Sequence, residues 1–538
     1  RLLRSHEKHG RLYEAFERGF HALNRRYAST LAATLRIRPV VVAVAALVAG
    51  ASYFLLMGLK SELAPIEDRG VLFTAGHAPE GSTIDFTSKY VDTFESMLKR
   101  IPEVQHYFVI VGSRAVTELI SFSQLINWED RDRTQMEILS KLQPQLKNVT
   151  GVRAFGNNPG SFGQSARNKP VEFVIQTPES YDKLQEYVDK VLEEAEKFPG
   201  FINLDSDLRL NKPQIEVDVD RERVADTGAG VLTVGRTLET LLGGRQVTRY
   251  NQNGEQYDVI VQVAPDDRRT PGDLNDIYVR GHGGSMIQLS NLVKVHETVA
   301  PKELNRFNQF RSATITGNIA EGYSLGQGLD YLEGVAERVL PPSSRYDFSG
   351  ESREFKEAGS SLLFVFILAL GFIFLVLSAQ FESFVDPLII MLTVPLSMTG
   401  ALLALNLSGG TLNIYSQIGL VTLIGLISKH GILIVEFANS LQEHGKPLRE
   451  AVIEAAVLRL RPILMTTAAM VAGAIPLAFA SGAGAQSRQE IGWVIVGGMT
   501  FGTLLTLFVV PTAYTLLAKD RSKMRRHEEE VELPKAAE

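Results

Sequence analysis

The sequence has no cysteine among its 538 residues. Without cysteine there is no disulfide, thiolate metal site or thiol catalysis, so a folded domain must rely on its core alone. Two motifs are absent as well: G-x-x-x-x-G-K-[ST], which binds nucleotide phosphates, and H-E-x-x-H, which binds zinc in metalloproteases. We therefore expect neither nucleotide-driven chemistry nor a cofactor.

An excess of positive charge is also lacking, because the formal net charge is −6. A protein that binds nucleic acid through its backbone phosphates normally presents a basic face. Here the Lys and Arg clusters fall beside apolar segments, where membrane topology explains them. We expect no nucleic-acid partner.

Long apolar segments are present near both ends of the chain, around a polar middle. A bilayer is crossed by a helix of about 20 mostly apolar residues. Six segments reach this length, at 38–58, 361–379, 385–405, 414–437, 462–480 and 491–517. The sequence thus predicts an α+β membrane protein with six transmembrane helices: one at 38–58 and a five-helix bundle over 361–517.

Basic residues predict how these helices are oriented. Nine Lys or Arg but only three acids occur up to residue 38, so the amino end should be cytoplasmic and residues 59–360 outside. Loop 438–461, with Lys446, Arg449, Arg459 and Arg461, and the tail 518–538, with five Lys or Arg between Lys519 and Arg526, then fall on the cytoplasmic side. Within 1–37, apolar residues at helical spacing predict an amphipathic interfacial helix on the membrane surface. Packing against protein outside this chain is the alternative.

Between the first two spans, strand and helix patterns follow the order β-α-β-β-α-β twice. The first unit covers 71–155, and the second covers 171–206 and 312–350. Two ferredoxin-like units are predicted, with an insertion at roughly 212–300. Within the insertion, Asn253-Gly254 between alternating segments predicts a hairpin over 245–263. Its polar tip is either a partner contact or a solvated turn.

Lys429 lies deep in the span at 414–437. A lysine at mid-membrane costs about 2.5–3.5 kcal/mol on insertion scales, so it should be paired and functional, although a structural ion pair or a snorkelling side chain is the alternative. The spans offer only Asp386 and Glu436 as acids, both near cytoplasmic ends. We therefore expect the partner carboxylate outside this chain, and an ion gradient as the energy source. Thr466 and Thr467 are further polar candidates.

Five motifs together resemble one transporter family: LAPIEDRGVLFT (63–74), NWEDR (127–131), GLISKHGILIVEFAN (425–439), LRLRPILMTTAAMVAGAIPLA (458–478) and GGMTFGTLLTLFVVPTAYTLL (497–517). The chain is similar to the carboxyl half of resistance-nodulation-division (RND) permeases, in their hydrophobe/amphiphile multidrug efflux branch. The resemblance implies a proton/drug antiporter of the bacterial inner membrane, exporting amphiphilic small molecules. It also implies a homotrimer, a periplasmic adaptor protein, an outer-membrane channel, and an amino-terminal half that carries an acidic pair. Because the chain opens on Arg1, we expect it to be a fragment of such a protein.

The resemblance also implies roles for particular residues and segments. Lys429, Arg459 and Thr466 match the proton relay. Segment 59–176 resembles a first periplasmic porter subdomain, and 177–211 with 301–350 a second. Segment 212–300 resembles a docking subdomain whose hairpin, with Asn251, Asn253 and Gly254, faces the outer channel.

The sequence departs from the family's drug-binding pattern. Loop 112–120 (GSRAVTELI) is shorter than the usual glycine-rich loop and lacks its phenylalanines, and Arg153 stands where a pocket phenylalanine is expected. Phe155 matches a second pocket phenylalanine, with a core position as the alternative. A narrower or more anionic substrate range follows as a hypothesis. A membrane-anchored assembly or protein-export factor without a small-molecule substrate remains the alternative function.

Overall fold

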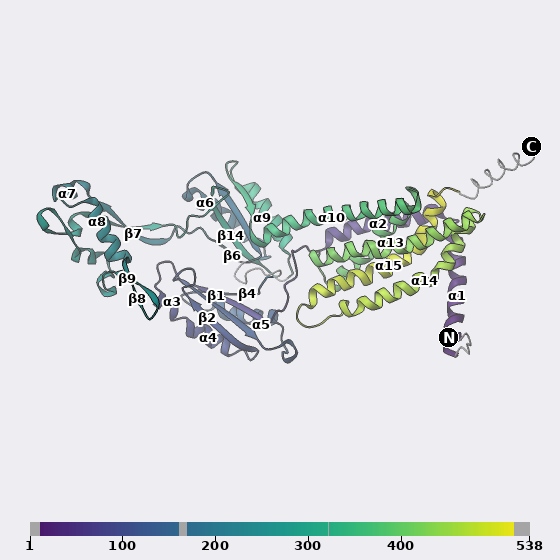
Figure 1. The fold of residues 1–538 in the computed structure, drawn as a ribbon, viewed down its shortest axis with the longest axis horizontal. Coiled ribbons are helices and arrows are strands. Elements are labelled where there is room, and N and C mark those ends of the chain that lie inside the picture. Colours follow the sequence, from purple (N-terminus) through teal and green to yellow (C-terminus); the bar gives the residue numbers. More distant parts are fainter. Residues whose placement is uncertain (1–10, 161–168, 321, 521–538) are drawn as a thin grey trace, which may run out of the picture.

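A computed structural model describes residues 11–160, 169–320 and 322–520. The molecule is elongated, with a bundle of long helices at one end, two sheets in the middle and a third α/β part at the far end (Figure 1). This confirms a mixed α+β protein with membrane helices. Residues 1–10 of the predicted interfacial segment and 521–538 of the predicted tail lie outside the described residues.

Six helical stretches in the described residues are long and apolar enough to span a bilayer. They are α2 (Arg38–Gly58), α10 (Gly350–Phe381), α11 (Val385–Met391) continued by α12 (Thr393–Ser408), α13 (Ile414–Glu443), α14 (Leu448–Ala478) and α15 (Ala485–Leu517). Each corresponds to one predicted apolar segment, although α14 ends two residues before its predicted segment does. Three begin earlier than predicted, at Gly350, Leu448 and Ala485, because hydropathy detects only the apolar part of a helix that continues with polar residues.

Helix α15 is the centre of the bundle and packs on α12, α13 and α14. Small residues allow the closest approach: a Cβ added to Gly497 would lie 2.3 Å from the Cβ of Ala404 and 2.6 Å from the carbonyl oxygen of Gly400. Helix α2, in contrast, has no buried residue and lies at the edge of the bundle. The close packing of α12 against α15 therefore determines where α13 can pack in the bundle.

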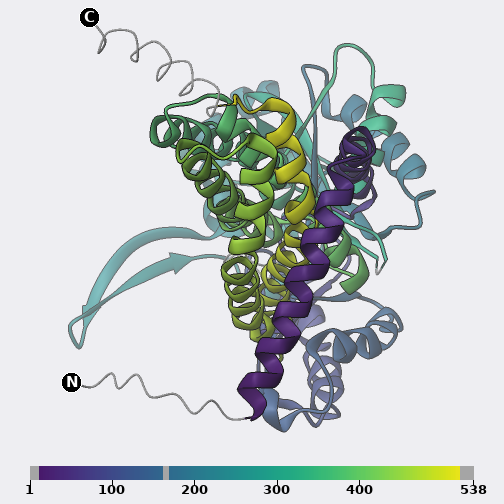
Figure 2. The same ribbon diagram turned by 90° about the vertical axis from the view of Figure 1, so that its right-hand side faces the viewer.

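Helix α1 (Arg11–Thr34) lies across the end of the spans (Figure 2). Tyr27 and Leu31, followed by Leu35, are buried in the same core as α13, α14 and α15. The Tyr27 hydroxyl donates to the Leu507 carbonyl at 2.6 Å. At these residues the apolar side of α1 is thus covered by the helix bundle of this chain. The sequence analysis had placed this side either on the membrane surface or against protein outside this chain.

The first sheet is antiparallel, with strand order β2-β3-β1-β4. Its elements are β1 (Val71–His77), α3 (Ile84–Ser88), α4 (Val91–Lys99), β2 (Val104–Val111), β3 (Glu118–Leu125), η1 (Trp128–Asp130), α5 (Gln135–Lys147) and β4 (Arg153–Asn157). Strand β3 begins at Glu118, so the predicted loop 112–120 is shorter than expected and covers only 112–117. Helices α4 and α5 pack on one face, where Gly76 and Gly156 meet Phe94 and Leu139.

The second sheet has five antiparallel strands: β14, β5 and β15 are neighbours in that order, and both β13 and β6 pair with β14. Its elements are β5 (Val171–Thr177), α6 (Tyr181–Ala195), β6 (Phe201–Ser206), β13 (Arg306–Phe307), β14 (Phe310–Ile319), α9 (Leu325–Val339) and β15 (Arg345–Phe348). Helices α6 and α9 supply the core with Leu184, Val188, Leu329 and Leu332. Strands β6, β14, β5 and β15 therefore lie in the same order in their sheet as β2, β3, β1 and β4 do in the first sheet.

The insertion forms the far end of the molecule and has its own core, which includes Val224, Val234 and Leu289. Its elements are β7 (Lys212–Val219), α7 (Arg221–Asp226), α8 (Val231–Leu238), η2 (Glu239–Gly244), β8 (Arg245–Gln252), β9 (Glu255–Val261), η3 (Pro265–Arg268), η4 (Pro271–Asp276), β10 (Tyr278–Arg280), η5 (His282–Gly284), β11 (Met286–Gln288), η6 (Leu289–Asn291) and β12 (Val293–Ala300). Strands β8 and β9 form the predicted hairpin, which projects as a teal ribbon in Figure 2.

Candidate functional site

Lys429 lies on α13 and is exposed on the outside of the bundle. Ile418, Thr422 and Gly425 share its exposed face at helical spacing, as does Glu436 two turns further on. No ion pair of Lys429 forms within the described residues. The lysine therefore faces the surroundings of this bundle from the middle of an apolar helix.

Arg459 and Thr466 lie on α14, which packs beside α13. The Arg459 guanidinium lies 4.6 Å from the centre of the Phe437 ring, and its Nε is buried without a hydrogen-bond partner. The Thr466 hydroxyl donates to the Ile463 carbonyl of its own helix at 3.0 Å. No hydrogen bond that we observe joins Lys429 to either residue.

The contact between His430 and Thr467, which follow Lys429 and Thr466 in the sequence, shows at what depth in the bundle the three predicted relay residues lie. His430 Nε2 lies 3.2 Å from the Thr467 hydroxyl, so Lys429 and Thr466, each one residue earlier, occupy similar levels. Arg459 is seven residues before Thr466, which is about 10 Å along a helix. The structure thus brings Thr466 to the level of Lys429 and leaves Arg459 nearer the predicted cytoplasmic end.

A buried cluster that sequence reasoning missed lies beside Lys429. His430 is fully buried, and Thr467 and Thr503 are 8% and 3% exposed. Both ring nitrogens of His430 are within hydrogen-bond distance of these hydroxyls. The sequence signal was the histidine that follows the lysine directly, together with the second threonine of the Thr466-Thr467 pair.

Acids within the spans differ from the sequence-based inventory. Asp386 is buried and accepts a hydrogen bond from Asn439 Nδ2 at 3.1 Å, whereas Glu436 is exposed. Glu490, near the start of α15, was not counted because α15 begins at Ala485 rather than near 491. It accepts from the Thr411 amide at 3.2 Å, and the Thr411 hydroxyl donates to Glu62 at 2.6 Å. Burial raises the pKa of Glu62.

A cleft of about 390 Å³ lies between the two sheets and includes Phe155. The ring of Phe155 stacks on His77 with centroids 5.5 Å apart, and Lys169 Nζ lies 5.4 Å from the ring centre. Burial lowers the pKa of Lys169 to about 8, and Nζ donates to the Asn203 carbonyl at 2.8 Å. Phe155 is therefore a half-buried wall of the cleft, with His77 and Lys169 on its ring.

Charge in this cleft is mixed. Four Lys or Arg and five Asp or Glu line it: Arg114, Lys169, Arg209, Lys302, Glu118, Glu172, Asp205, Asp207 and Glu303. Arg153 is not among the lining residues; its side chain is 65% exposed and its guanidinium lies 3.7 Å from Asp205. The lining therefore does not favour anions over cations.

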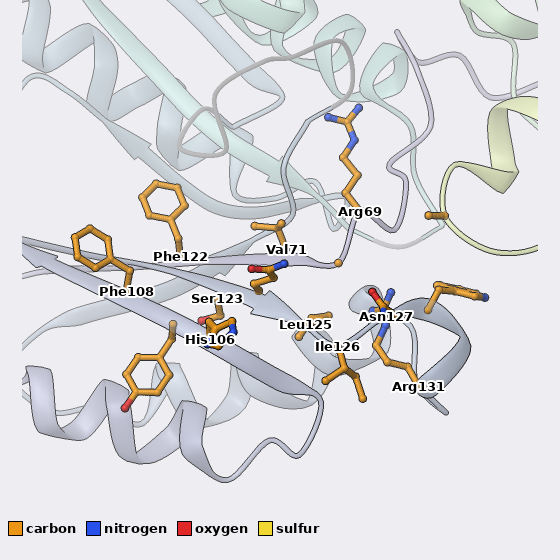
Figure 3. Close-up of a pocket in the computed structure, with 15 residues that line it drawn as sticks. Arg69, Val71, His106, Phe108, Phe122, Ser123, Leu125, Ile126, Asn127 and Arg131 are labelled. Carbon is orange, nitrogen blue, oxygen red and sulfur yellow. The ribbon is translucent and has the colours of Figure 1, made fainter.

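A second cavity, of about 520 Å³, follows the β2 and β3 side of the first sheet (Figure 3). Phe108, 64% exposed, and Phe122 lie near each other at one end, and Asn127 and Arg131 lie at the other. Ala483 of the loop between α14 and α15 completes the lining. Sequence reasoning missed these phenylalanines because alternation predicted only that strand residues face one side or the other.

The tip of the β8–β9 hairpin carries Asn251, Asn253 and Gly254, all of them exposed. Asn253 and Gly254 have φ values of 53° and 83°, as a tight hairpin turn with left-handed residues requires. Tyr250 and Tyr257 stack behind the tip, with ring centroids 5.5 Å apart.

The described residues contain no group of three or more His, Cys, Asp or Glu that could hold a metal ion.

Six candidate spans, with a large α/β part between the first two and a lysine on the outer face of one of them, are typical of a polytopic membrane protein. The chain belongs to the AcrB/AcrD/AcrF family, which matches residues 1–518. This confirms the resemblance to RND multidrug efflux permeases, so the protein is of a transporter family rather than an enzyme in the usual sense.

Three relatives illustrate the similarity. An uncharacterized transporter of Haemophilus influenzae is 36% identical over 531 residues, covering 97% of this chain and 52% of that protein. The multidrug/solvent efflux pump membrane transporter MepB of Pseudomonas putida is 31% identical over 524 residues, with coverage of 95% and 50%. The toluene efflux pump membrane transporter TtgB of Pseudomonas putida is 31% identical over 545 residues, with the same coverage. The chain spans about half the length of these curated relatives.

Proposed function

We propose that this chain is one half of a proton-driven efflux transporter that exports amphiphilic small molecules. The observation that carries the proposal is Lys429, exposed on the outer face of α13 in the middle of an apolar span. A lysine at that depth is stable only beside a partner or water. A carboxylate from the complementary half of the pump, packed against this face, would supply the partner.

In this proposal Lys429, Arg459 and Thr466 form the proton relay. A carboxylate beside Lys429 stays ionised as long as the ammonium is its counter-ion, and protonation of the carboxylate releases the lysine. The pairing therefore changes with each proton, and the helices that carry the two groups change their packing. The similar depth of Lys429 and Thr466 supports this grouping.

The substrate path runs through the part between α2 and α10. We assign two ferredoxin-like porter subdomains to 59–176 and to 177–211 with 301–350. Phe155 in the cleft, with Phe108 and Phe122 in the second cavity, offers aromatic surface to amphiphilic molecules. Arg153 lies outside the cleft lining and contributes charge near it. The names of the relatives, solvent and toluene pumps among them, support apolar or amphiphilic cargo.

The remaining assignments concern location and assembly. The α/β part is periplasmic, and the spans lie in the bacterial inner membrane. Segment 212–300 is the docking subdomain, and its exposed hairpin, with Asn251, Asn253 and Gly254, contacts an outer-membrane channel. The working pump is a homotrimer that also binds a periplasmic adaptor.

The test is dye efflux from cells that lack other pumps and express the chain with its complementary half. Lys429→Ala should abolish efflux that is sensitive to a proton uncoupler, and Lys429→Arg should be strongly impaired because a guanidinium does not deprotonate. Lys519→Ala, which removes an exposed lysine beyond α15, is the matched control. Normal efflux by Lys429→Ala at equal expression would refute the relay, and so would efflux by this chain alone.

A further inference from the structure

Segment 60–63, which follows α2 in the chain, is bonded to the loop that leads into α13. Ser61 and Leu412 form a parallel β-bridge. The Ile414 amide, in the first residue of α13, donates to the Leu63 carbonyl at 3.2 Å. Helix α2 itself has no buried residue. The start of α13 therefore determines the position of this segment more than α2 does.

Side chains around Thr411 strengthen this contact. The Thr411 hydroxyl donates to Glu62 Oε1 at 2.6 Å and accepts from Asn413 Nδ2 at 2.7 Å. The Thr411 amide donates to Glu490 Oε1, near the start of α15, at 3.2 Å. Asn413 Oδ1 caps α13 by accepting from two amides of its first turn. Glu62, Thr411, Asn413 and Glu490, which we call the polar joint, thus connect segment 60–63 with α13 and α15.

The hydroxyl of Thr411 is the critical group of the polar joint. It carries one hydrogen, and Glu490 Oε1 lies 3.2 Å away as a second acceptor. Glu490 also accepts from the Thr411 amide and from Asn413 Nδ2. In the described part of the chain we find no second donor to the Glu62 carboxylate. One hydrogen bond therefore holds the Glu62 side chain to the start of α13, and Thr411→Val would remove it while keeping the amide.

The chain continues from the polar joint directly into the first sheet. Glu67 accepts from the Ser487 hydroxyl of α15 at 2.6 Å, and Asp68 forms a buried ion pair with Arg131 at 2.9 Å. Strand β1 begins shortly afterwards and pairs with β4, which carries Phe155 of the cleft. The first sheet, one wall of the cleft, is therefore bonded to the starts of both α13 and α15.

The second sheet, the other wall of the cleft, also meets segment 60–63. The Ser61 carbonyl accepts from the Gly326 amide, near the start of α9, at 3.1 Å. The two residues are closely packed, because a Cβ on Gly326 would collide with the Ser61 hydroxyl. The second sheet continues into the bundle through α10. A displacement of the start of α13 would therefore move the first wall relative to the second.

We propose that the polar joint couples α13, the helix of Lys429, to the first wall of the cleft, with Glu62, Thr411 and Glu490 as positioning residues. The inference rests on the proposed function, in which α13 changes its packing as the carboxylate partner of Lys429 gains or loses a proton. Lys429 lies about 22 Å along α13 from its first residue. The helix carries a displacement at the lysine to its own start, and the polar joint transmits it to the cleft.

The first test measures the cleft directly. The chain has no cysteine, so Ala115→Cys places a single thiol on the cleft lining. In cells that express the pump with a cysteine-free complementary half, labelling by a small membrane-impermeant maleimide is timed with and without a proton uncoupler. For Ala115→Cys alone we expect the rate to change about fivefold or more, as is typical of coupled sites.

The same measurement is then made with the polar joint altered. In Thr411→Val the labelling rate should no longer respond to the uncoupler. In Thr411→Ser it should respond again, because serine retains the hydroxyl that Glu62 accepts from. An equal response in Thr411→Val, or no response in Ala115→Cys alone, would overturn the proposal.

The second test separates position from charge at Glu62. Glutamine keeps a side-chain oxygen that accepts from Thr411, whereas leucine has none. In uncoupler-sensitive dye efflux, Glu62→Leu should lower the maximal rate about tenfold, as the loss of one such hydrogen bond can. The half-saturating dye concentration should stay unchanged, because the cleft lining is intact. Glu62→Gln should pump much faster than Glu62→Leu at equal amounts in the membrane.

The control is Thr515→Val, which removes a hydroxyl bonded to its own helix at Thr512 and should match the wild type. If Glu62→Gln is as slow as Glu62→Leu, the residue acts through its charge and the inference fails. If the wild type pumps and Glu62→Leu matches it, the inference fails while the proposed function stands. If the wild type does not pump, the proposed function fails, and this inference fails with it.

Discussion

Replacing Asp68 by asparagine should destabilise the first sheet unit severely. Asp68 and Arg131 form an ion pair at 2.9 Å with side chains only 6% and 2% exposed. The carboxylate also accepts from the amides of Gly70 at 3.0 Å and Gln135 at 2.7 Å. The substitution leaves Arg131 as a buried charge without its counter-ion, which typically costs about 3–5 kcal/mol.

The chain has a suitable probe for this loss, because it contains only two tryptophans. Trp128 lies 5.1 Å from the Arg131 guanidinium, and Trp493 packs on Phe479 within the bundle. In a Trp493→Phe background, fluorescence during urea unfolding reports on Trp128 alone. With a typical slope of about 2 kcal/mol per molar urea, the midpoint should fall by roughly 1.5–2.5 M.

The control is Lys99→Met, which removes an exposed ion pair to Glu95 in the same unit. Exposed helical pairs contribute only about 0.3–0.5 kcal/mol, so this midpoint should hardly move. The double variant Asp68→Asn with Arg131→Met should recover part of the loss, because no buried charge is left unpaired. A midpoint for Asp68→Asn within the range of Lys99→Met would refute the reasoning.

Two further predictions concern packing and pH. Gly497→Leu should lower the midpoint of thermal unfolding, because its Cβ would collide with Ala404 and overpacking costs about 1–3 kcal/mol; Gly473→Leu, at a position with open space, is the control, and equal midpoints would contradict the packing. Lys169 has a folded-state pKa of about 8 against an ordinary 10.5. Between these two pKa values the unfolded state therefore binds more protons than the folded state, so the free energy of unfolding, measured in urea, should rise from pH 8 to about 10.5. Lys169→Met should remove this rise, whereas the control Lys183→Met should not. A rise that persists in Lys169→Met would exclude this lysine as its cause.

Features encoded locally were predicted well from the sequence. Long apolar segments identified all six spans, and Asn253-Gly254 identified the hairpin, because hydropathy and turn chemistry act over a few neighbouring residues. Helix ends were predicted less well. The apolar signal stops at the bilayer boundary, whereas α10 and α14 continue with polar residues.

Contacts between distant segments could not be predicted in this way. Asp68 and Arg131 belong to two motifs that carried the family resemblance, yet nothing local indicates that they pair. The depth of Lys429 in its span could be predicted from the sequence. The direction in which its side chain faces could not, because that direction depends on where α14 and α15 pack. The His430 cluster needs three helices in place before its hydrogen bonds exist.

The long helix α10 has a mechanical consequence. It follows β15 directly, and the Ser352 hydroxyl near its start bonds to the Glu172 amide and the Pro170 carbonyl, both at 2.9 Å. Its 32 residues make a rod of about 48 Å that leads from the second sheet into the bundle (Figure 1). A tilt of about 5° at the membrane end therefore shifts the sheet end by about 4 Å. The first sheet is instead connected to α2 by the non-helical segment 59–70. A change of helix tilt in the bundle is therefore transmitted through a continuous helix to the second sheet, but through a non-helical segment to the first sheet on the other side of the cleft.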